Sequence, residues 1–218
     1  ADTQTFTVQN VTTWTPASVT TLLWLDASDA STITESSGSV SQWDDKSGND
    51  YHAAQGTGAR QPITGATTEN ALNVIDFADA SAVATGKKLK SSTPDPADWR
   101  DTYIVAKWTG GTNTADSHLD YVGLFNGVTG NTANYGFTGH SNFSQLYAST
   151  WRDNFYLNAG SEGVPIPLVD ELTSAFLISF SGDDAVDADG YQVGATGAYI
   201  TSRVWVGWVG EVVCFSSK

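Results

Sequence analysis

The apolar residues of this chain occur in short runs that Gly, Asn, Asp and Ser interrupt, and no long helical period is present. In the segment 176–180, Phe176, Ile178 and Phe180 alternate with Leu177 and Ser179, which predicts a half-buried strand. Thr102–Trp108 is a second clear strand candidate. Many short strands without intervening helices predict an all-β fold, with antiparallel strands in a two-sheet jelly-roll sandwich.

Two segments carry more specific expectations. Asn126-Gly127 follows the strand candidate Tyr121–Phe125, and this dipeptide is typical of a tight turn. The segment Arg203–Phe215 is apolar on both faces, which predicts a central strand covered on both sides. Strict alternation there places one set of residues on one face and a second set on the other: Val204, Val206, Trp208, Val212 and Cys214 against Trp205, Val209, Glu211, Val213 and Phe215.

The 218 residues are expected to form one domain preceded by an arm. Residues 1–20 are rich in Thr and poor in charge, which suggests an extended N-terminal arm. Residues 21–218 show no repeat and no linker, so we expect a single jelly-roll domain, since β-sandwiches often reach this size as one unit.

The net charge of −14 narrows the range of partners. An acidic chain repels phosphate backbones, and the densest basic stretch, Lys87, Lys88 and Lys90, is small. We therefore expect no nucleic-acid partner. No run of 18 apolar residues is present, so membrane insertion is not expected either.

The residues needed for known sugar-cleaving chemistry are scattered. Glycoside hydrolysis uses two carboxylates that face one glycosidic bond. The chain has five Glu, far apart in sequence, and no Glu-x-Asp-x-Glu spacing: Glu35, Glu69, Glu162, Glu171 and Glu211. The three His are equally dispersed, so neither a zinc site nor a lyase site is indicated. We expect a protein that is not an enzyme.

Two acidic loops match the oxygen-rich chemistry that calcium prefers. Asp44, Asp45, Ser47 and Asn49 lie in one Gly-containing turn. The segment 182–190 holds four Asp between two Gly, of which three are the predicted metal ligands: Asp183, Asp187 and Asp189. Calcium is the expected cofactor, and a solvated acidic turn without a metal is the alternative for both loops.

A mixture of aromatic and hydrogen-bonding residues between positions 147 and 156 is typical of sugar sites, where rings stack on sugars and polar groups bind hydroxyls. Tyr147, Trp151, Arg152 and Asn154 are the candidate carbohydrate-binding residues in this segment. Trp108, before Gly110-Gly111, is a candidate second platform. The alternative is that these aromatic side chains belong to the core.

Several stretches together resemble the concanavalin A-like lectin/glucanase superfamily, in particular its laminin-G-like jelly rolls. They span about residues 20–216 and are, in order, Leu22-Leu23-Trp24-Leu25-Asp26-Ala27-Ser28-Asp29, Val40-Ser41-Gln42-Trp43-Asp44-Asp45-Lys46-Ser47-Gly48-Asn49, Tyr51-His52-Ala53-Ala54-Gln55, Asn73-Val74-Ile75-Asp76-Phe77 and Trp208-Val209-Gly210-Glu211-Val212-Val213. The resemblance implies a two-sheet antiparallel sandwich of a kind that often binds glycans, sometimes with calcium. It also implies occurrence in adhesins and in bacteriophage structural proteins.

The expected function is therefore a non-catalytic carbohydrate-binding or adhesion module on a cell or virion exterior. The first alternative is a phage decoration protein that binds capsid or tail proteins through residues 1–20. The second is a polysaccharide-cleaving enzyme with an unfamiliar site. The first residues lack a signal peptide's basic start and apolar stretch, so we expect either a leader removed before Ala1 or a trimmed initiator Met.

Overall fold

The computed structural model describes residues 14–78, 86–91, 99–109, 123–127, 137–139, 145–148, 154–158, 160–161, 166–167, 174–186, 190–196 and 199–215. Within these residues the chain is built from β-strands, and helical structure is limited to the short 3-10 turns η1 (Pro16–Ser18), η2 (Ala30–Thr32) and η3 (Gly58–Arg60). The predicted all-β class is confirmed.

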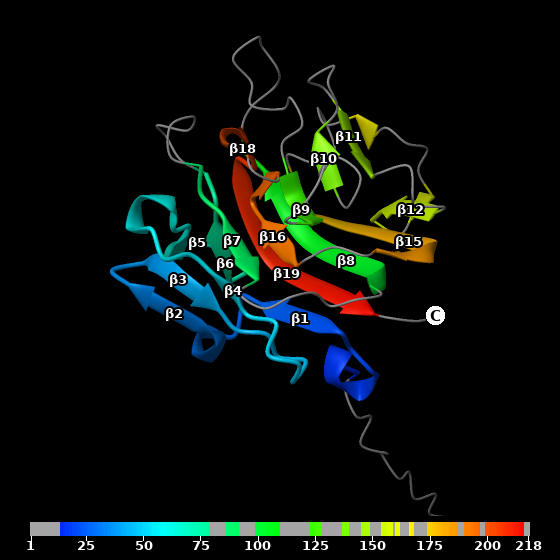
Figure 1. Ribbon diagram of the computed structural model, residues 1–218, viewed down its shortest axis with the longest axis horizontal. Helices are drawn as coiled ribbons and strands as arrows, with labels where there is room; N and C mark the ends of the chain where they lie inside the picture. The colour runs from blue at the N-terminus through cyan, green and yellow to red at the C-terminus, as the bar shows by residue number, and fades with distance from the viewer. Residues whose placement is uncertain are drawn as a thin grey trace, which may run out of the picture.

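The strands form one curled sheet in which two runs can be followed, antiparallel except at one pair (Figure 1). On one edge of β19, the first run continues through β8, β15 and β12 to β13. On the other edge, β6 and β1 pair with successive parts of β19, and β5 pairs with β6. The strands of this run are β5 (Ile63–Glu69), β6 (Leu72–Asp76), β1 (Leu23–Asp26), β19 (Gly207–Phe215), β8 (Trp99–Trp108), β15 (Phe176–Val186), β12 (Asn154–Leu157) and β13 (Gly160–Ser161).

The second run consists of β2 (Ile33–Ser36), β3 (Ser39–Trp43), β4 (Ala53–Ala54), β7 (Leu89–Ser91), β16 (Tyr191–Val193), β9 (Gly123–Gly127), β10 (Phe137–Gly139), β11 (Gln145–Ala148) and β14 (Ile166–Pro167). The strands β17 (Ala195–Thr196) and β18 (Tyr199–Val204) adjoin β9, and β18 runs parallel to it. The two runs are joined where Ser39 of β3 pairs with Ile63 of β5.

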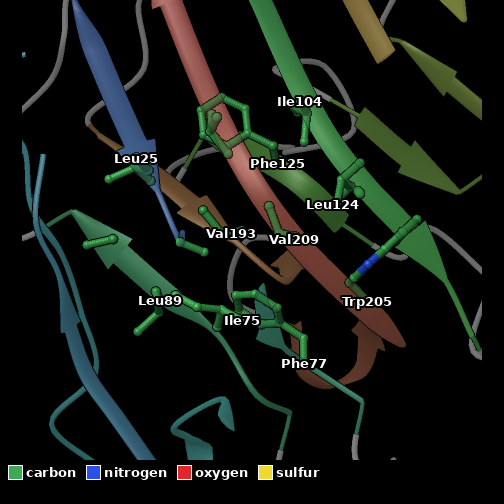
Figure 2. Packing of buried hydrophobic residues seen from close by; sticks show 14 of the residues in the cluster. Leu25, Ile75, Phe77, Leu89, Ile104, Leu124, Phe125, Val193, Trp205 and Val209 are labelled. Carbon is green, nitrogen blue, oxygen red and sulfur yellow. The ribbon is translucent and has the colours of Figure 1, made fainter. Parts of the chain in front are cut away.

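One hydrophobic core lies inside the curl. Figure 2 shows Leu25, Ile104 and Val209 of the first run meeting Leu124, Phe125 and Val193 of the second. All six side chains are fully buried. Each run therefore has an inward face in the core and an outward face away from it.

The segment Arg203–Phe215, predicted as one strand, is divided between β18 and β19, and residues 205–206 lie in neither. Its larger part, β19, lies between other strands as expected, because β8 pairs along one edge and β1 and β6 share the other. Its two faces differ from the strict alternation expected. The register shifts between Val209 and Glu211, which is a β-bulge around Gly210. Consequently Val209, Val212 and Cys214 belong to the core, while Trp208 faces outward with Glu211.

The tight turn predicted at Asn126-Gly127 is wrong. Both residues continue β9, where Gly127 pairs with Tyr191 and Asn126 with Gln192. The Asn126 side chain is fully buried and its Nδ2 donates to the carbonyl oxygen of Ala195 at 3.4 Å. A tertiary hydrogen bond therefore overrides the local turn preference of this dipeptide.

Candidate functional site

The outward face of the first run carries one row of residues in direct cross-strand register. Trp24 of β1 pairs with Val213 of β19, and Val213 pairs with Tyr103 of β8. Tyr103 pairs with Ser179 of β15, and Ser179 pairs with Tyr156 of β12. Aromatic residues thus occupy every second strand of this row. Since neighbouring strands lie about 5 Å apart, successive aromatic positions are separated by about 10 Å.

A groove of about 630 Å³ lies over the first half of this row. We call it the outer-face groove. Its lining residues come from β1, β8 and β19 and from residues 14–16 before and at the start of η1: Trp14, Thr15, Pro16, Trp24, Tyr103, Glu211, Val213 and Phe215. The lining is thus rich in aromatic rings and carries one carboxylate. Tyr103 also packs edge-on against Phe215, with ring centroids 5.9 Å apart.

Two smaller hollows adjoin the outer-face groove on the same side of the sheet. Tyr103 also lines a hollow that contains Tyr156, Asp101 and Ser181. Glu211 also lines a hollow that contains Trp208. The concave surface is therefore longer than the groove itself and crosses the strands of the first run.

Trp24 is held in place at its backbone and at its ring. Its backbone N donates to Asp45 Oδ1 at 2.9 Å, and its indole Nε1 donates to Glu211 Oε1 at 2.8 Å. The Lys46 ammonium lies 4.3 Å from the ring centroid, within cation–π range. These contacts fix one aromatic wall of the groove before any ligand binds.

Glu211 and Asp26 are cross-strand neighbours whose pKa values are shifted in opposite directions. Burial raises the pKa of Glu211, the Trp24 hydrogen bond opposes this, and the nearby Asp26 charge adds to the rise. Burial also acts to raise the pKa of Asp26, but hydrogen bonds from Lys46 and Ser28 outweigh it and lower that pKa. Of these two carboxyl groups, Glu211 is therefore the one that takes up a proton more readily.

The raised pKa of Glu211 predicts a specific pH dependence of stability. At a pH between the unfolded and the folded pKa of Glu211, the folded state binds more protons than the unfolded state. The stabilisation that results from this proton binding is complete below the unfolded pKa and is lost as pH rises through the folded pKa. Denaturant unfolding of wild type and Glu211→Gln from pH 3 to 8 checks this. The wild type should lose stability relative to the variant as pH rises, and a constant difference would contradict the assignment.

The described residues of the sugar site predicted from the sequence do not lie together. Trp108 is 2% exposed and belongs to the core, where its ring centroid lies 5.0 Å from that of Trp205. Its assignment as a sugar platform is corrected accordingly, because no ring face is free to stack. Trp151 and Arg152 lie outside the described residues.

Tyr147 and Asn154 lie in different runs of strands. Tyr147 on β11 pairs with Thr138 in the second run, whereas Asn154 on β12 pairs with Ser181 in the first. Asn154 therefore has a register position next to the aromatic row. The described residues of the predicted segment therefore lie on both runs.

The predicted calcium ligands are only partly described. Asp183 lies within β15, which continues to Val186 where a loop was expected, and Val186 pairs with Trp99. Asp187 and Asp189 lie outside the described residues. In the described part of the chain, no group of three or more His, Cys, Asp or Glu side chains is arranged to hold a metal ion. Calcium at this segment stays a prediction.

The other acidic turn, at residues 44–49, is stabilised by hydrogen bonds to Asp45. Asp45 is 7% exposed, and each of its two carboxylate oxygens accepts two hydrogen bonds. Oδ1 accepts from the backbone N of Trp24 and of Ser47, both at 2.9 Å. Oδ2 accepts from Ser47 Oγ at 2.7 Å and from the Tyr51 backbone N at 3.2 Å. Protein donors thus occupy the positions that a cation would need.

A lysine links two further carboxylates beside this turn. Lys46 Nζ lies 2.8 Å from Asp26 Oδ2 and 2.9 Å from Asp29 Oδ2. Hydrogen bonds from Ser31 and then from Lys46 lower the pKa of Asp29 to about 2. The Lys46 ammonium therefore serves as the counter-ion of the acidic residues at this end of β1.

The sequence reasoning missed Trp24, Tyr103 and Glu211 as site residues. One signal was present for Tyr103. In Thr102–Trp108 it lies on the face opposite Ile104 and Ala106, where a solvent-facing strand would carry polar residues. An aromatic residue on the outward face of a strand indicates a surface that contacts something other than the core.

Comparisons of the chain with protein-family models, curated proteins and solved structures return no match. No helix in the described residues has the length and apolar character needed to cross a membrane.

Proposed function

We propose that this protein is a non-catalytic carbohydrate-binding module and that the outer-face groove receives the glycan. The observation that carries the proposal is the aromatic lining of the groove, with Tyr103 41% exposed and Glu211 beside the fixed ring of Trp24. Aromatic rings stack on sugar faces, and the carboxylate accepts hydrogen bonds from hydroxyl groups.

An extended glycan chain fits this face better than a single sugar. Tyr103 and Tyr156 lie two strands apart on either side of Ser179, and the hollow between them also contains Asp101 and Ser181. Rings at intervals of about 10 Å, with hydroxyl and carboxylate groups between them, suit a polymer that crosses the strands.

The absence of catalysis is part of the proposal. Asp26 is the carboxylate nearest to Glu211 in register, but its oxygens are engaged by Ser28 and Lys46. A carboxylate held in this way is a poor base or nucleophile, because its lone pairs already accept hydrogen bonds. Polysaccharide cleavage that is lost in Glu211→Gln would overturn this part and favour the enzyme alternative.

We propose a concanavalin A-like jelly roll as the finer description of the fold. Support comes from the shared core of the two runs and from the central position of β19, the strand on which the resemblance of Trp208-Val209-Gly210-Glu211-Val212-Val213 rests. A module of this kind belongs on an exterior surface, either extracellular or on a virion.

One observation favours the decoration alternative. The side chain of Trp14, at the end of the N-terminal arm, is 63% exposed and lies at the edge of the outer-face groove. A large exposed indole beside an apolar groove is typical of a protein–protein contact as well as of a sugar contact. A capsid or tail partner that binds through the arm would therefore meet the same surface.

Tyr103→Ala is expected to weaken binding to a recognised polysaccharide by about 5-fold to 150-fold, since loss of one stacked ring costs about 1–3 kcal/mol by analogy with stacking on other planar ligands. Tyr103→Phe, which keeps the ring, should retain most of the affinity. Affinity electrophoresis or calorimetry against a panel of polysaccharides measures the effect.

Leu177→Ala is the matched control for this experiment. Leu177 is 38% exposed on β15 and lies outside the residues that line the groove and its adjoining hollows. Its truncation should leave glycan binding unchanged. Equal loss in both variants, or no retention on any polysaccharide of the panel, would contradict the proposal, and the second outcome would favour decoration.

A further inference from the structure

Lys88 is a lysine in an unusual position. Its residue is only 9% exposed, although lysine is almost never buried without a partner. Its backbone is fixed on both sides, because its N donates to the Arg60 carbonyl oxygen at 3.1 Å and its carbonyl oxygen accepts from Gln55 Nε2 at 3.1 Å. These bonds join the residue before β7 to the end of η3 and to the residue after β4.

Among the residues that the structure describes, the charges that act on Lys88 are those of the cations Lys90 and Arg60. The ion pairs among the described residues involve Lys46, His52 and Lys107, and none includes Lys88. Burial, followed by the charges of Lys90 and Arg60, lowers the pKa of Lys88 to about 8. A buried charge without a counter-ion is costly, so a group that binds there and neutralises it is favoured.

The fold brings the three cations together from two elements. Leu89 and Ser91 of β7 are buried, and strand alternation puts Lys88 and Lys90 on the opposite side of the strand. The backbone hydrogen bond from Lys88 places Arg60 of η3 beside this part of the chain, close enough for its charge to act on the Lys88 ammonium. The chain carries 24 acidic and 10 basic side chains, so three neighbouring cations that form no ion pair within the described residues run against its overall negative charge.

We propose that Lys88, Lys90 and Arg60 form a binding site for a tetrahedral oxyanion, either inorganic sulfate or phosphate or a sulfate ester carried by a sugar. Arginine binds such groups through two parallel N–H donors, and lysine binds them as a point charge. The site lies on the second run of strands, away from the strands that form the outer-face groove, so it goes beyond the proposed carbohydrate binding and does not depend on it.

Thermal unfolding in sodium sulfate and in sodium chloride of equal ionic strength tests this site. Sulfate stabilises most proteins by exclusion from their surface, so the decisive quantity is the sulfate increment in Tm of wild type compared with that of Lys88→Gln. The wild-type increment should exceed that of Lys88→Gln by several degrees. Lys87→Gln, which removes the neighbouring charge, should keep the wild-type increment.

A titration of Lys88 by NMR keeps the test independent of folding stability. The pKa of the Lys88 ammonium should rise in inorganic sulfate, because a bound anion favours the charged form. A sulfated oligosaccharide distinguishes the two sources of the oxyanion: a rise with the oligosaccharide alone assigns the site to an ester, and a rise with the inorganic salt assigns it to the free ion. Equal Tm increments in wild type and Lys88→Gln, or an unchanged Lys88 pKa with both probes, would overturn the proposal.

Discussion

Asp45→Ala is expected to lower the free energy of unfolding by about 3–5 kcal/mol, because it removes a buried charged acceptor and leaves its donors without partners. The backbone N–H groups of Trp24, Ser47 and Tyr51 all point to this carboxylate. Its loss also frees the backbone at Trp24, so the wall of the outer-face groove should loosen with the turn. Urea or guanidinium unfolding measures the stability.

Asp44→Ala is the control for this prediction. Asp44 is adjacent in sequence, but its side chain is 36% exposed and accepts one side-chain hydrogen bond, from Gln42. Its loss should change stability by about 1 kcal/mol or less. Similar losses in both variants would mean that Asp45 is one more turn residue and does not anchor β1.

Gly207→Ala is expected to destabilise the protein by about 3 kcal/mol or more, because a side chain there has no space. A Cβ at this position would lie 2.0 Å from the carbonyl oxygen of Lys107 and 2.9 Å from Trp205 Nε1. The first contact is with the backbone of the paired strand β8, which cannot move without breaking the register of β19. Thermal unfolding of the purified variant, or its failure to fold on expression, measures this effect.

Gly210→Ala is the control for this prediction, because it distinguishes a steric clash at Gly207 from a general sensitivity of β19 to substitution. The nearest atom to a Cβ at Gly210 is Val105 Cγ1 at 3.6 Å, an ordinary van der Waals contact. This variant should fall within about 1 kcal/mol of wild type. If Gly207→Ala is equally mild, the close approach of β19 and β8 at Lys107 is not as tight as described.

Local sequence pattern located several of the strands, but it failed where a single residue changes the register. The apolar runs at Leu22–Leu25, Val40–Trp43 and Thr102–Trp108 all lie in or overlap strands. The bulge at Gly210 moved Trp208 to the outward face, because one extra residue reverses the alternation on one side of it. Asn126 entered a strand because its buried side chain found a distant carbonyl.

The candidate site could not be predicted from local sequence pattern, because its residues lie on strands that are distant from one another in the sequence. Trp24, Tyr103 and Tyr156 are neighbours in one row only because β1, β19, β8, β15 and β12 pair in that order. Pairing between strands so distant in sequence depends on the whole sheet. The aromatic segment 147–156 was conspicuous in sequence, yet β11 and β12 carry its described residues into separate runs.

The position of β19 has a consequence for the order in which this protein is made. The strand covers residues 207–215, yet it contributes Val209, Val212 and Cys214 to the core and pairs with β1, almost 190 positions earlier, where Leu25 faces Val212. Until those residues leave the ribosome, β1 and β8 have no strand between them. Until then their apolar faces stay exposed to chaperones or to other chains, and closure of the sheet is slow because its key contacts join residues almost 190 positions apart.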